Sequence, residues 1–223
     1  MNDLDASRLF NMKLWYDIET APLPMAQLEK LMPEFEPAGN LKDPDKIKAS
    51  IEAKKAEWLD KAALKAVSGK IVAVTIAVES LEPQMVDGDD EAILINVVLA
   101  FLKEVIIQQD RAYAWNGHAF DLPFICQRAA VHGIPAFQEL MVNVRGRFYW
   151  HEFLIDPKLV WANYSQDHTG TSLKSVALAL GVGEKVGSGK DFAELLKSDP
   201  AEAERYALAD VNLLRSIVER MGI

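Results

Sequence analysis

The sequence has a single cysteine and little positive charge. Cys126 alone cannot form an intrachain disulfide framework, so a reducing compartment is favoured and a cytoplasmic location is expected. The chain has 24 Lys and Arg residues against 33 Asp and Glu residues, for a net charge of −9. This balance excludes binding to nucleic acid through bulk positive charge, although a local binding site remains compatible with it.

The sequence also lacks a long hydrophobic run. Residues 92–102 form the longest apolar stretch, which Asn96 interrupts, and they predict a buried helix that is too short to cross a bilayer. Residues 1–11 contain two acids and no apolar core, so we expect no signal peptide and no membrane partner. With 223 residues, half of them hydrophobic, the chain can form one large α/β domain.

The order of the expected elements is strands first and then strands alternating with helices. The expected strands cover residues 13–18, 70–78, 84–86, 111–115 and 153–155. The expected helices cover residues 25–32, a longer stretch opening at 43–45, about 91–108, 122–131, 173–180 and about 200–221. This order predicts a mixed five-stranded sheet flanked by helices, within a single domain over residues 1–223.

Residues 23–67 are expected to form a helical insertion after the first strand. Asp43, Pro44 and Asp45 are typical of a helix start, because they supply a cap, a fixed φ and a favourable charge. The insertion is rich in lysine: Lys46, Lys48, Lys54, Lys55, Lys61 and Lys65. These lysines indicate either a solvated helix face or an arm that contacts phosphate.

The segment 15–20 delivers two carboxylates near the end of the first strand. Successive strand residues point to opposite faces, so Asp17 and Glu19 project together while Ile18 points away. Pro22 and Pro24 are expected to end the strand, because proline cannot donate to a ladder. Two adjacent carboxylates repel each other unless a cation joins them, and oxygen ligands suit Mg²⁺ or Mn²⁺. An ordinary solvated turn with two acids is the alternative.

Two further acids are expected near this pair. Asp121 follows the strand that ends before Asn116, and ligand sites in open α/β sheets gather at the carboxyl ends of strands. Asp121 could equally be a helix N-cap, a role that aspartate fills well. Tyr206 and Asp210 are four residues apart and share one face of the last helix, beside its apolar stripe.

These three patterns resemble the three motifs of the DEDD 3′–5′ exonucleases. The patterns are Asp17-x-Glu19, Asn116-x-x-x-Phe120-Asp121 and Tyr206-x-x-x-Asp210. The tyrosine is typical of the DEDDy subgroup, since the histidine subgroup has a histidine at the position of Arg205. The second motif is most similar to the proofreading domain of family B DNA polymerases and its stand-alone relatives. The resemblance covers residue 14 to about residue 220 and implies a ribonuclease-H-like fold.

The resemblance implies a role for each acid in a two-metal reaction. Phosphodiester hydrolysis needs a hydroxide nucleophile and relief of charge on the leaving oxygen, which two Mg²⁺ or Mn²⁺ ions supply. Asp17 would bridge the ions, Glu19 and Asp210 would hold the nucleophile-side ion, and Asp121 would hold the second. Tyr206 would orient the attacking water, because a phenol with a pKa near 10 is a poor general base at neutral pH.

The implied substrate is the 3′ end of DNA, with single-stranded ends preferred. Thr20, Asn116, His118 and Phe120 are the expected substrate contacts. RNA is the nearest alternative substrate, and a catalytically silent binding or scaffold module is the alternative of a different class. The chain contains no polymerase domain, so proofreading or a related role in DNA repair would require a polymerase partner in trans.

Several other features are interpreted without a motif behind them. Residues 181–190 are rich in glycine, but Glu184 and Asp191 break the phosphate-loop pattern, so a turn is expected. Trp161 and Tyr164 are expected to pack in the core, with stacking on bases as the alternative. Arg145 and Arg147 precede three aromatic residues, and this cluster indicates either a charged loop or edge strand or an element that binds the nucleic-acid strand.

Overall fold

A computed structural model describes residues 12–79, 81–165, 169–185, 187 and 192–223. The chain divides into two compact units. One comprises the chain up to Glu19 together with Ile71–Ile223, and the other is Thr20–Lys70. That residues 1–223 form a single domain with an insertion stays a prediction.

Five strands form one mixed sheet, which confirms the predicted α/β class and strand number. The strands are β1 (Lys13–Pro22), β2 (Gly69–Val78), β3 (Gln84–Asp87), β4 (Arg111–Tyr113) and β7 (Leu154–Ile155). Their order is β3-β2-β1-β4-β7. β4 runs parallel to both β1 and β7, whereas β3 is antiparallel to β2. The parallel strands β1, β4 and β7 therefore end at one edge of the sheet, where an active site is expected.

β1 is longer than the sequence predicted. It continues through Asp17 and Glu19 and ends at Pro22, so the two acids lie within the strand rather than at its end. Proline is tolerated there because the last residue of a strand does not have to donate a ladder hydrogen bond. The alternation of side chains therefore applies directly to Asp17 and Glu19 and places both on one face.

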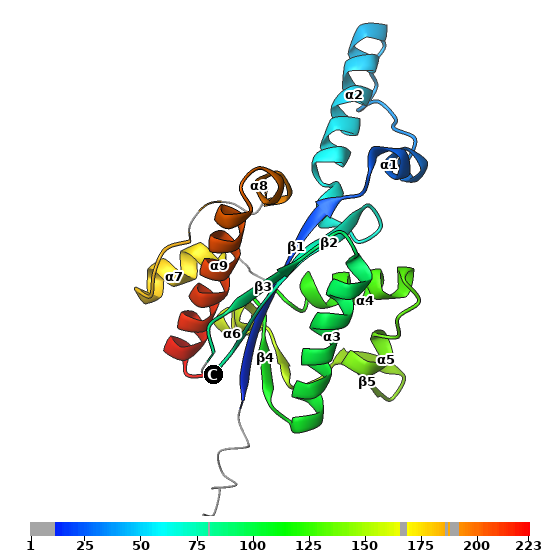
Figure 1. Ribbon diagram of the computed structural model, residues 1–223. Helices are drawn as coiled ribbons and strands as arrows, with labels where there is room; N and C mark the ends of the chain where they lie inside the picture. Colours follow the sequence, from blue (N-terminus) through cyan, green and yellow to red (C-terminus); the bar gives the residue numbers. More distant parts are fainter. Residues whose placement is uncertain (1–11, 80, 166–168, 186, 188–191) are drawn as a thin grey trace, which may run out of the picture. The chain divides into compact units, whose positions relative to one another are not determined.

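Helices cover both faces of the sheet in the larger unit (Figure 1). α3 and α4 lie on one side, and α7 and α9 lie on the other. The helices of this unit are α3 (Glu91–Gln108), α4 (Asp121–Val131), α5 (Phe137–Leu140), α6 (Pro157–Trp161), α7 (Leu173–Leu180), α8 (Phe192–Ser198) and α9 (Pro200–Met221). None of the helices described is both long and apolar enough to span a membrane.

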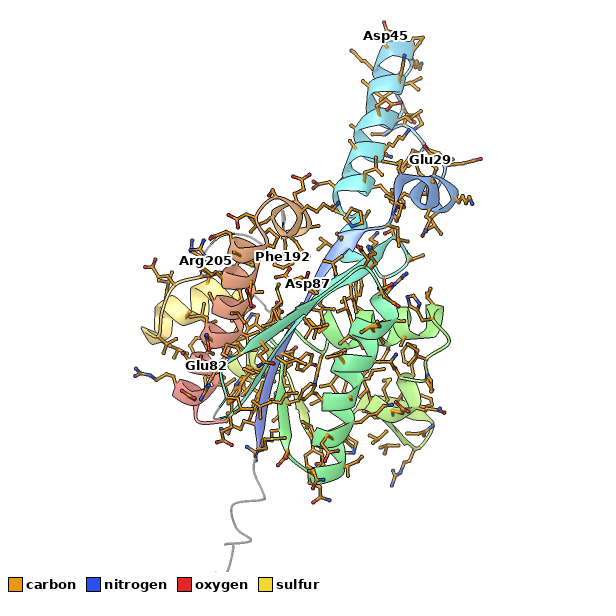
Figure 2. All side chains as sticks on the ribbon, in the orientation of Figure 1. Glu29, Asp45, Glu82, Asp87, Phe192 and Arg205 are labelled. Atoms are coloured by element: carbon orange, nitrogen blue, oxygen red, sulfur yellow. The ribbon has the colours of Figure 1, made fainter. Side chains whose placement is uncertain are left out.

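Helix α9 closes the core against the strands. Val211, Leu214 and Val218 pack in one buried cluster with Trp15 of β1 and Tyr113 of β4, whose rings stack 6.0 Å apart. The apolar residues recur at helical spacing, so the sequence could predict this face. The opposite, polar face of α9 includes Arg205, which is exposed and pairs with Glu202 (Figure 2).

The smaller unit contains three short or exposed helices. They are α1 (Met25–Leu31), α2 (Pro44–Asp60) and the 3₁₀ helix η2 (Ala62–Leu64). The carboxylate of Asp43 accepts hydrogen bonds from the amides of Asp45 and Lys46, which confirms the predicted helix start. No residue of α2 is fully buried, so its lysines lie at the surface or only partly covered. Whether they contact phosphate stays a prediction.

Several short elements were not predicted. β5 (Met141–Val144) and β6 (Arg147–Trp150) form a separate antiparallel hairpin, with Arg145 and Gly146 at its turn. Helices α5, α6 and α8 have between four and seven residues. These segments carry too little periodicity to be recognised in the sequence, although the equally short β3, β4 and β7 were predicted.

Candidate active site

Strand β1 places the first two acids beside each other at the carboxyl end of the parallel strands. Asp17 is partly buried and Glu19 is only 8% exposed. Ile18 between them is buried, and its amide donates to Oδ1 of Asp121 over 3.3 Å. This hydrogen bond ties the start of α4 to the middle of the acid pair.

The loop before Asp121 is shaped by a close approach and by a buried carboxylate. A Cβ at Gly117 would lie 2.7 Å from Cβ of Ala114, so the turn after β4 requires glycine. Asp156 accepts from the amides of Asn116 (3.0 Å) and His118 (3.2 Å). Asn116 itself has a φ of 63°, a left-handed conformation that this side chain tolerates. The loop thus delivers Asp121 in a fixed position.

Asp121 is the first residue of α4 and is 1% exposed. The N-cap position belongs to Phe120, whose side chain makes no capping hydrogen bond. The alternative that Asp121 is the N-cap is therefore wrong. Its carboxylate reaches the backbone of β1, because the preceding loop turns it toward that strand.

Helix α9 presents Tyr206 and Asp210 on one face, as their spacing predicted. Both are largely buried, at 6% and 5% exposure. The ring of Phe192 on α8 packs with its centre 5.9 Å from the centre of the Tyr206 ring and so contacts the tyrosine from the side of α8. The carboxylate oxygen Oδ1 of Asp210 is buried and has no hydrogen-bond partner.

A cavity of about 200 Å³ brings three of the four acids together with the tyrosine. The residues that line it are Asp17, Ile18, Glu19, Trp115, Leu173, Lys185, Tyr206, Asp210 and Leu214. Asp121 is buried next to this group, close enough for its charge to act on Glu19 and for the charge of Asp17 to act on it. The structure therefore places all four predicted acids in one electrostatic cluster.

Lys185 is the charged residue of this cavity that the sequence did not point to. Its ammonium forms an ion pair with Oδ2 of Asp210 and lies over the ring of Tyr206, 5.3 Å from the ring centre. It belongs to the glycine-rich segment predicted as a turn, in which Gly181 ends α7 with a φ of 65°. Residues 186 and 188–190 of that segment lie outside the described residues.

Burial and mutual repulsion disfavour ionisation of the acids. Burial, together with the charge of Asp210, raises the pKa of Asp17 from 3.8 to about 7. Burial and the charges of Asp17 and Asp210 raise the pKa of Glu19 from 4.5 to about 9. Burial, followed by the charge of Asp17, also raises the pKa of Asp121 well above its usual range. The Lys185 ammonium lowers the pKa of both Asp17 and Glu19, but only in part.

Tyr206 is held in its neutral form. Burial raises the pKa of its phenol well above 10, and the charge of Asp210 raises it further. The hydroxyl is therefore a hydrogen-bond donor throughout the physiological range, as a positioning role requires.

The donor set is suited to a hard divalent cation. Exonucleases of this kind typically use divalent metals. The four acids offer only oxygen ligands, the type that Mg²⁺ and Mn²⁺ prefer, and the unpartnered Oδ1 of Asp210 lies among them. Across the residues that the structure describes, no three acidic, histidine or cysteine side chains form a ready-made metal-binding group. The four acids thus have the right donor atoms for a divalent cation, but their side chains would have to move to coordinate one.

The expected substrate contacts Thr20, Asn116, His118 and Phe120 are not among the described residues that line the cavity. Asn116 accepts from Nζ of Lys158 over 2.8 Å, and the ring of His118 bonds to the Leu154 carbonyl over 2.6 Å. Phe120 packs on Phe124, and Thr20 is half-buried in the smaller unit. The contact of all four residues with substrate stays a prediction.

The aromatic residues without a motif are more exposed than expected. Trp161 is 39% exposed and Tyr164 is 71% exposed, so the expectation that they pack in the core is wrong. Tyr164 lies just after the end of α6 and has a φ of 55°, a left-handed backbone conformation. On β6, Phe148 and Tyr149 are likewise exposed, beside Arg147.

Comparison with solved structures defines the class of fold. The chain is similar to the family B DNA polymerase from the hyperthermophilic archaeon Pyrobaculum calidifontis, with a TM-score of 0.61 and 15% sequence identity. The match covers 95% of this chain and 24% of the polymerase, so the chain spans about a quarter of its length. The fold is thus the ribonuclease-H-like fold of a polymerase exonuclease domain, which confirms the prediction.

Comparison with protein families assigns the chain more closely. Residues 56–212 match the family described as a predicted 3′–5′ exonuclease related to the exonuclease domain of PolB, and the chain belongs to that family. The match includes Asp121, Tyr206 and Asp210 and begins after Asp17 and Glu19. A search of curated protein sequences gave no match. Family membership supports a nuclease that acts on nucleic acid.

Proposed function

We propose that this protein is a DEDDy-type 3′–5′ exonuclease that removes nucleotides from single-stranded 3′ ends of DNA. One observation carries the proposal: Asp17 and Glu19 of β1 and Tyr206 and Asp210 of α9 line one cavity, with Asp121 buried beside them. These side chains come from three distant parts of the sequence and converge at the sheet edge. Their types and order are those of the DEDDy motifs.

The acids would act as ligands for two Mg²⁺ or Mn²⁺ ions. Asp17 would contact both, Glu19 and Asp210 would hold the ion on the side of the nucleophile, and Asp121 would hold the other. When bound, such ions lower the pKa of water and offset charge on the scissile phosphate and the leaving oxygen.

The protein's own groups supply orientation. Tyr206 is neutral and buried against Phe192, so its hydroxyl can donate to or accept from a water molecule without changing protonation state. Trp115 and Leu173 line the same cavity, and their apolar side chains would exclude water from part of it. Exclusion of water strengthens the electrostatic interactions of the acids.

The 3′-terminal nucleotides would enter beside the loop of Asn116, His118 and Phe120. Asp156 holds two amides of this loop, and the partly exposed ring of Phe120 would offer a base a surface to stack on. A frayed or single strand is favoured because its bases are free to stack, whereas a duplex must first be opened. Proofreading or a related repair role in trans to a polymerase would follow from this preference.

A degradation assay on end-labelled oligonucleotides tests the proposal. Single-stranded DNA and RNA of the same sequence are incubated with the protein in Mg²⁺, in Mn²⁺ or in EDTA. We expect metal-dependent shortening that is faster on DNA and absent in EDTA. Faster hydrolysis of RNA would instead assign a 3′–5′ exoribonuclease. Binding of either strand with no hydrolysis in any metal would assign a silent binding or scaffold module.

A further inference from the structure

Helix α3 has an exposed surface that is unusually apolar. Ile93 is 57% exposed and Ile107 is 70% exposed. The exposed residues of α3 are Ile93, Asn96, Ala100, Phe101, Glu104, Ile107 and Gln108. On α9, by contrast, the exposed residues beyond the first two are all polar or charged: Glu204, Arg205, Asn212, Glu219 and Arg220. A solvated helix face is normally polar, so the outer face of α3 has the character of a contact surface.

The apolar residues of this face have the spacing of a helix–helix seam. Ile93, Val97, Ala100, Glu104 and Ile107 follow one another by alternate steps of four and three residues. This is the 3.5-residue repeat with which one helix packs along another. Val97 is half-buried and the other four are exposed. The residues that α3 buries in the core occupy other positions, so this seam is a second one, directed outward.

The seam is symmetric about Ala100. Ile93 and Ile107 lie seven residues before and after it, which is roughly 10 Å along the helix axis in each direction. In an antiparallel pair of α3 helices with a twofold axis at Ala100, Ile93 of one copy would meet Ile107 of the other, twice. The small side chain of Ala100 allows the two helices to approach closely where they cross.

The polar residues beside the seam agree with the antiparallel register. Asn96 and Glu104 each lie four residues from Ala100, so the amide of one copy would lie opposite the carboxylate of the other. Nδ2 of Asn96 donates to the Ala92 carbonyl over 2.8 Å, and a carboxamide has a second hydrogen for such a contact. A parallel pair would instead set Glu104 against Glu104, and two carboxylates at one level repel each other.

We propose that α3 is a self-association surface, on which a second copy of this chain packs its own α3 antiparallel, with Ile93 against Ile107 on either side of Ala100. Self-association of this kind does not depend on the proposed exonuclease activity. α3 lies on the face of the sheet opposite α7 and α9 (Figure 1), and the candidate active site is lined from β1, α7 and α9, so the dimer would leave both cavities open.

The expected dimer is weak. An 18-residue helix is about 27 Å long and about 10 Å wide. Such a helix face covers less than the roughly 800 Å² per partner of a standard stable interface. We therefore expect a Kd in the micromolar range.

Charge substitutions test both the surface and its register. Ile93→Lys and Ile107→Glu each set a charge against an isoleucine in both contacts of the dimer and should raise the Kd at least about tenfold, because an unpaired charge is costly to cover. An equimolar mixture of the two variants should dimerise again, since the introduced lysine of one faces the introduced glutamate of the other. In a parallel pair the mixture would bring no opposite charges together.

Leu178→Lys is the matched control, because Leu178 is also an exposed apolar helix residue, at 49%, but lies on α7. Sedimentation velocity of the full chain over about 1–500 µM covers the expected Kd. Wild type and Leu178→Lys should change from monomer to dimer over this range. The substituted side chains are exposed in the monomer, so the variants should melt close to wild type. If a charged variant does not fold, the double variant Ile93→Ala, Ile107→Ala replaces it and should likewise weaken the dimer.

The proposal is overturned if wild type stays monomeric at the highest concentration. It is also overturned if the substitutions at Ile93 and Ile107 leave a dimer intact, or if Leu178→Lys weakens it equally, since the contact would then lie on another face. If both single variants weaken the dimer and their mixture does not restore it, the antiparallel register is refuted. Restoration in the mixture, with Leu178→Lys unchanged, supports the surface and the register together.

Discussion

Asp210 is the residue on which the proposed chemistry depends most. It is buried, it shares the cavity with Asp17 and Glu19, and one of its oxygens lacks a partner. Tyr206 lies one helical turn before it and is uncharged. The two residues therefore have separable functions, because one carries ligand charge and the other a positioning hydroxyl.

Substitution of these two residues should have different effects. Asp210→Ala should abolish hydrolysis, since it removes a proposed direct ligand. Tyr206→Phe keeps the ring against Phe192 and should slow the chemical step roughly 10²-fold, the scale of one lost catalytic contact, with metal binding unchanged. Single-turnover rates and Mn²⁺ titration check both effects. If the rate of Tyr206→Phe is within twofold of wild type, Tyr206 does not have the positioning role of the DEDDy tyrosine.

The raised pKa values of Asp17 and Glu19 predict how stability depends on pH when metal is chelated. The folded state holds their protons up to about pH 7 and pH 9, whereas the unfolded state loses them near 3.8 and 4.5. The folded state thus binds more protons, so the free energy of unfolding falls as pH rises through this window. We expect wild type to lose on the order of 2 kcal/mol or more between pH 5 and 9, since each unit of pKa difference is worth about 1.4 kcal/mol.

Urea denaturation in EDTA at several pH values checks this expectation. The double variant Asp17→Asn, Glu19→Gln is the control, because it removes both titrations and keeps the shape of the side chains. The difference in stability between wild type and the control should change in favour of the control as pH rises. If the difference stays constant, or moves in favour of wild type, ionisation of Asp17 and Glu19 does not destabilise the folded protein.

At the residue scale the sequence predicted the acids but not their counter-ion. Strand alternation and helical spacing alone place Asp17 beside Glu19, and Tyr206 beside Asp210. Lys185 lies in a glycine-rich stretch without periodicity, so nothing in the local pattern states where its side chain points. Its place follows only from long-range packing against α9.

Among the elements, the loop between β4 and α4 has the most demanding geometry. One buried carboxylate, that of Asp156, accepts from the amides of Asn116, His118 and Lys158. It joins the loop to the start of α6, which directly follows β7. Positioning of Asp121 therefore depends on a residue 35 positions away in the sequence.

Removing this carboxylate should be far more costly than removing a simple helix cap. Asp156→Ala leaves partly buried amides without an acceptor and should lower the free energy of unfolding by roughly 2–4 kcal/mol. Asp199→Ala is the matched control, because Asp199 only caps α9 at the surface and should cost about 1 kcal/mol. Chemical denaturation measures both. Equal losses in the two variants would mean that Asp156 acts as a helix cap alone.

The long elements were all predictable, whereas only some of the short ones were: β3, β4, β7 and α1 were predicted, and β5, β6, α5, α6 and α8 were not. α3 and α9 have 18 and 22 residues and carry clear caps and apolar stripes. The hairpin of β5 and β6 depends on a turn at Arg145 and Gly146, and its strands have four residues each. The sequence analysis also ended β1 too early, at residue 18 instead of Pro22. Pro22 and Pro24 show that the strand cannot continue beyond them, but they do not show that it ends before them.

For the whole molecule, charge is distributed unevenly between the two units. Thr20–Lys70 contains nine lysines and eight acids, which leaves a net charge of −10 on the remainder of the chain. The net negative charge of the unit with the acid cluster thus repels a polyanion, and only its local basic groups attract one. Binding of a nucleic-acid 3′ end to this unit should therefore depend on divalent cations that offset the acids.

The polarity of degradation tests the proposed exonuclease activity most directly. A single-stranded DNA labelled at its 5′ end is incubated with wild type in Mn²⁺, with Asp210→Ala as control. A companion strand carries a blocked 3′ terminus. We predict a ladder of labelled products that shorten by one nucleotide at a time, no ladder from the blocked strand and none with the variant. Release of the label as a mononucleotide, or fragments cut at internal positions of the blocked strand, would contradict the proposal.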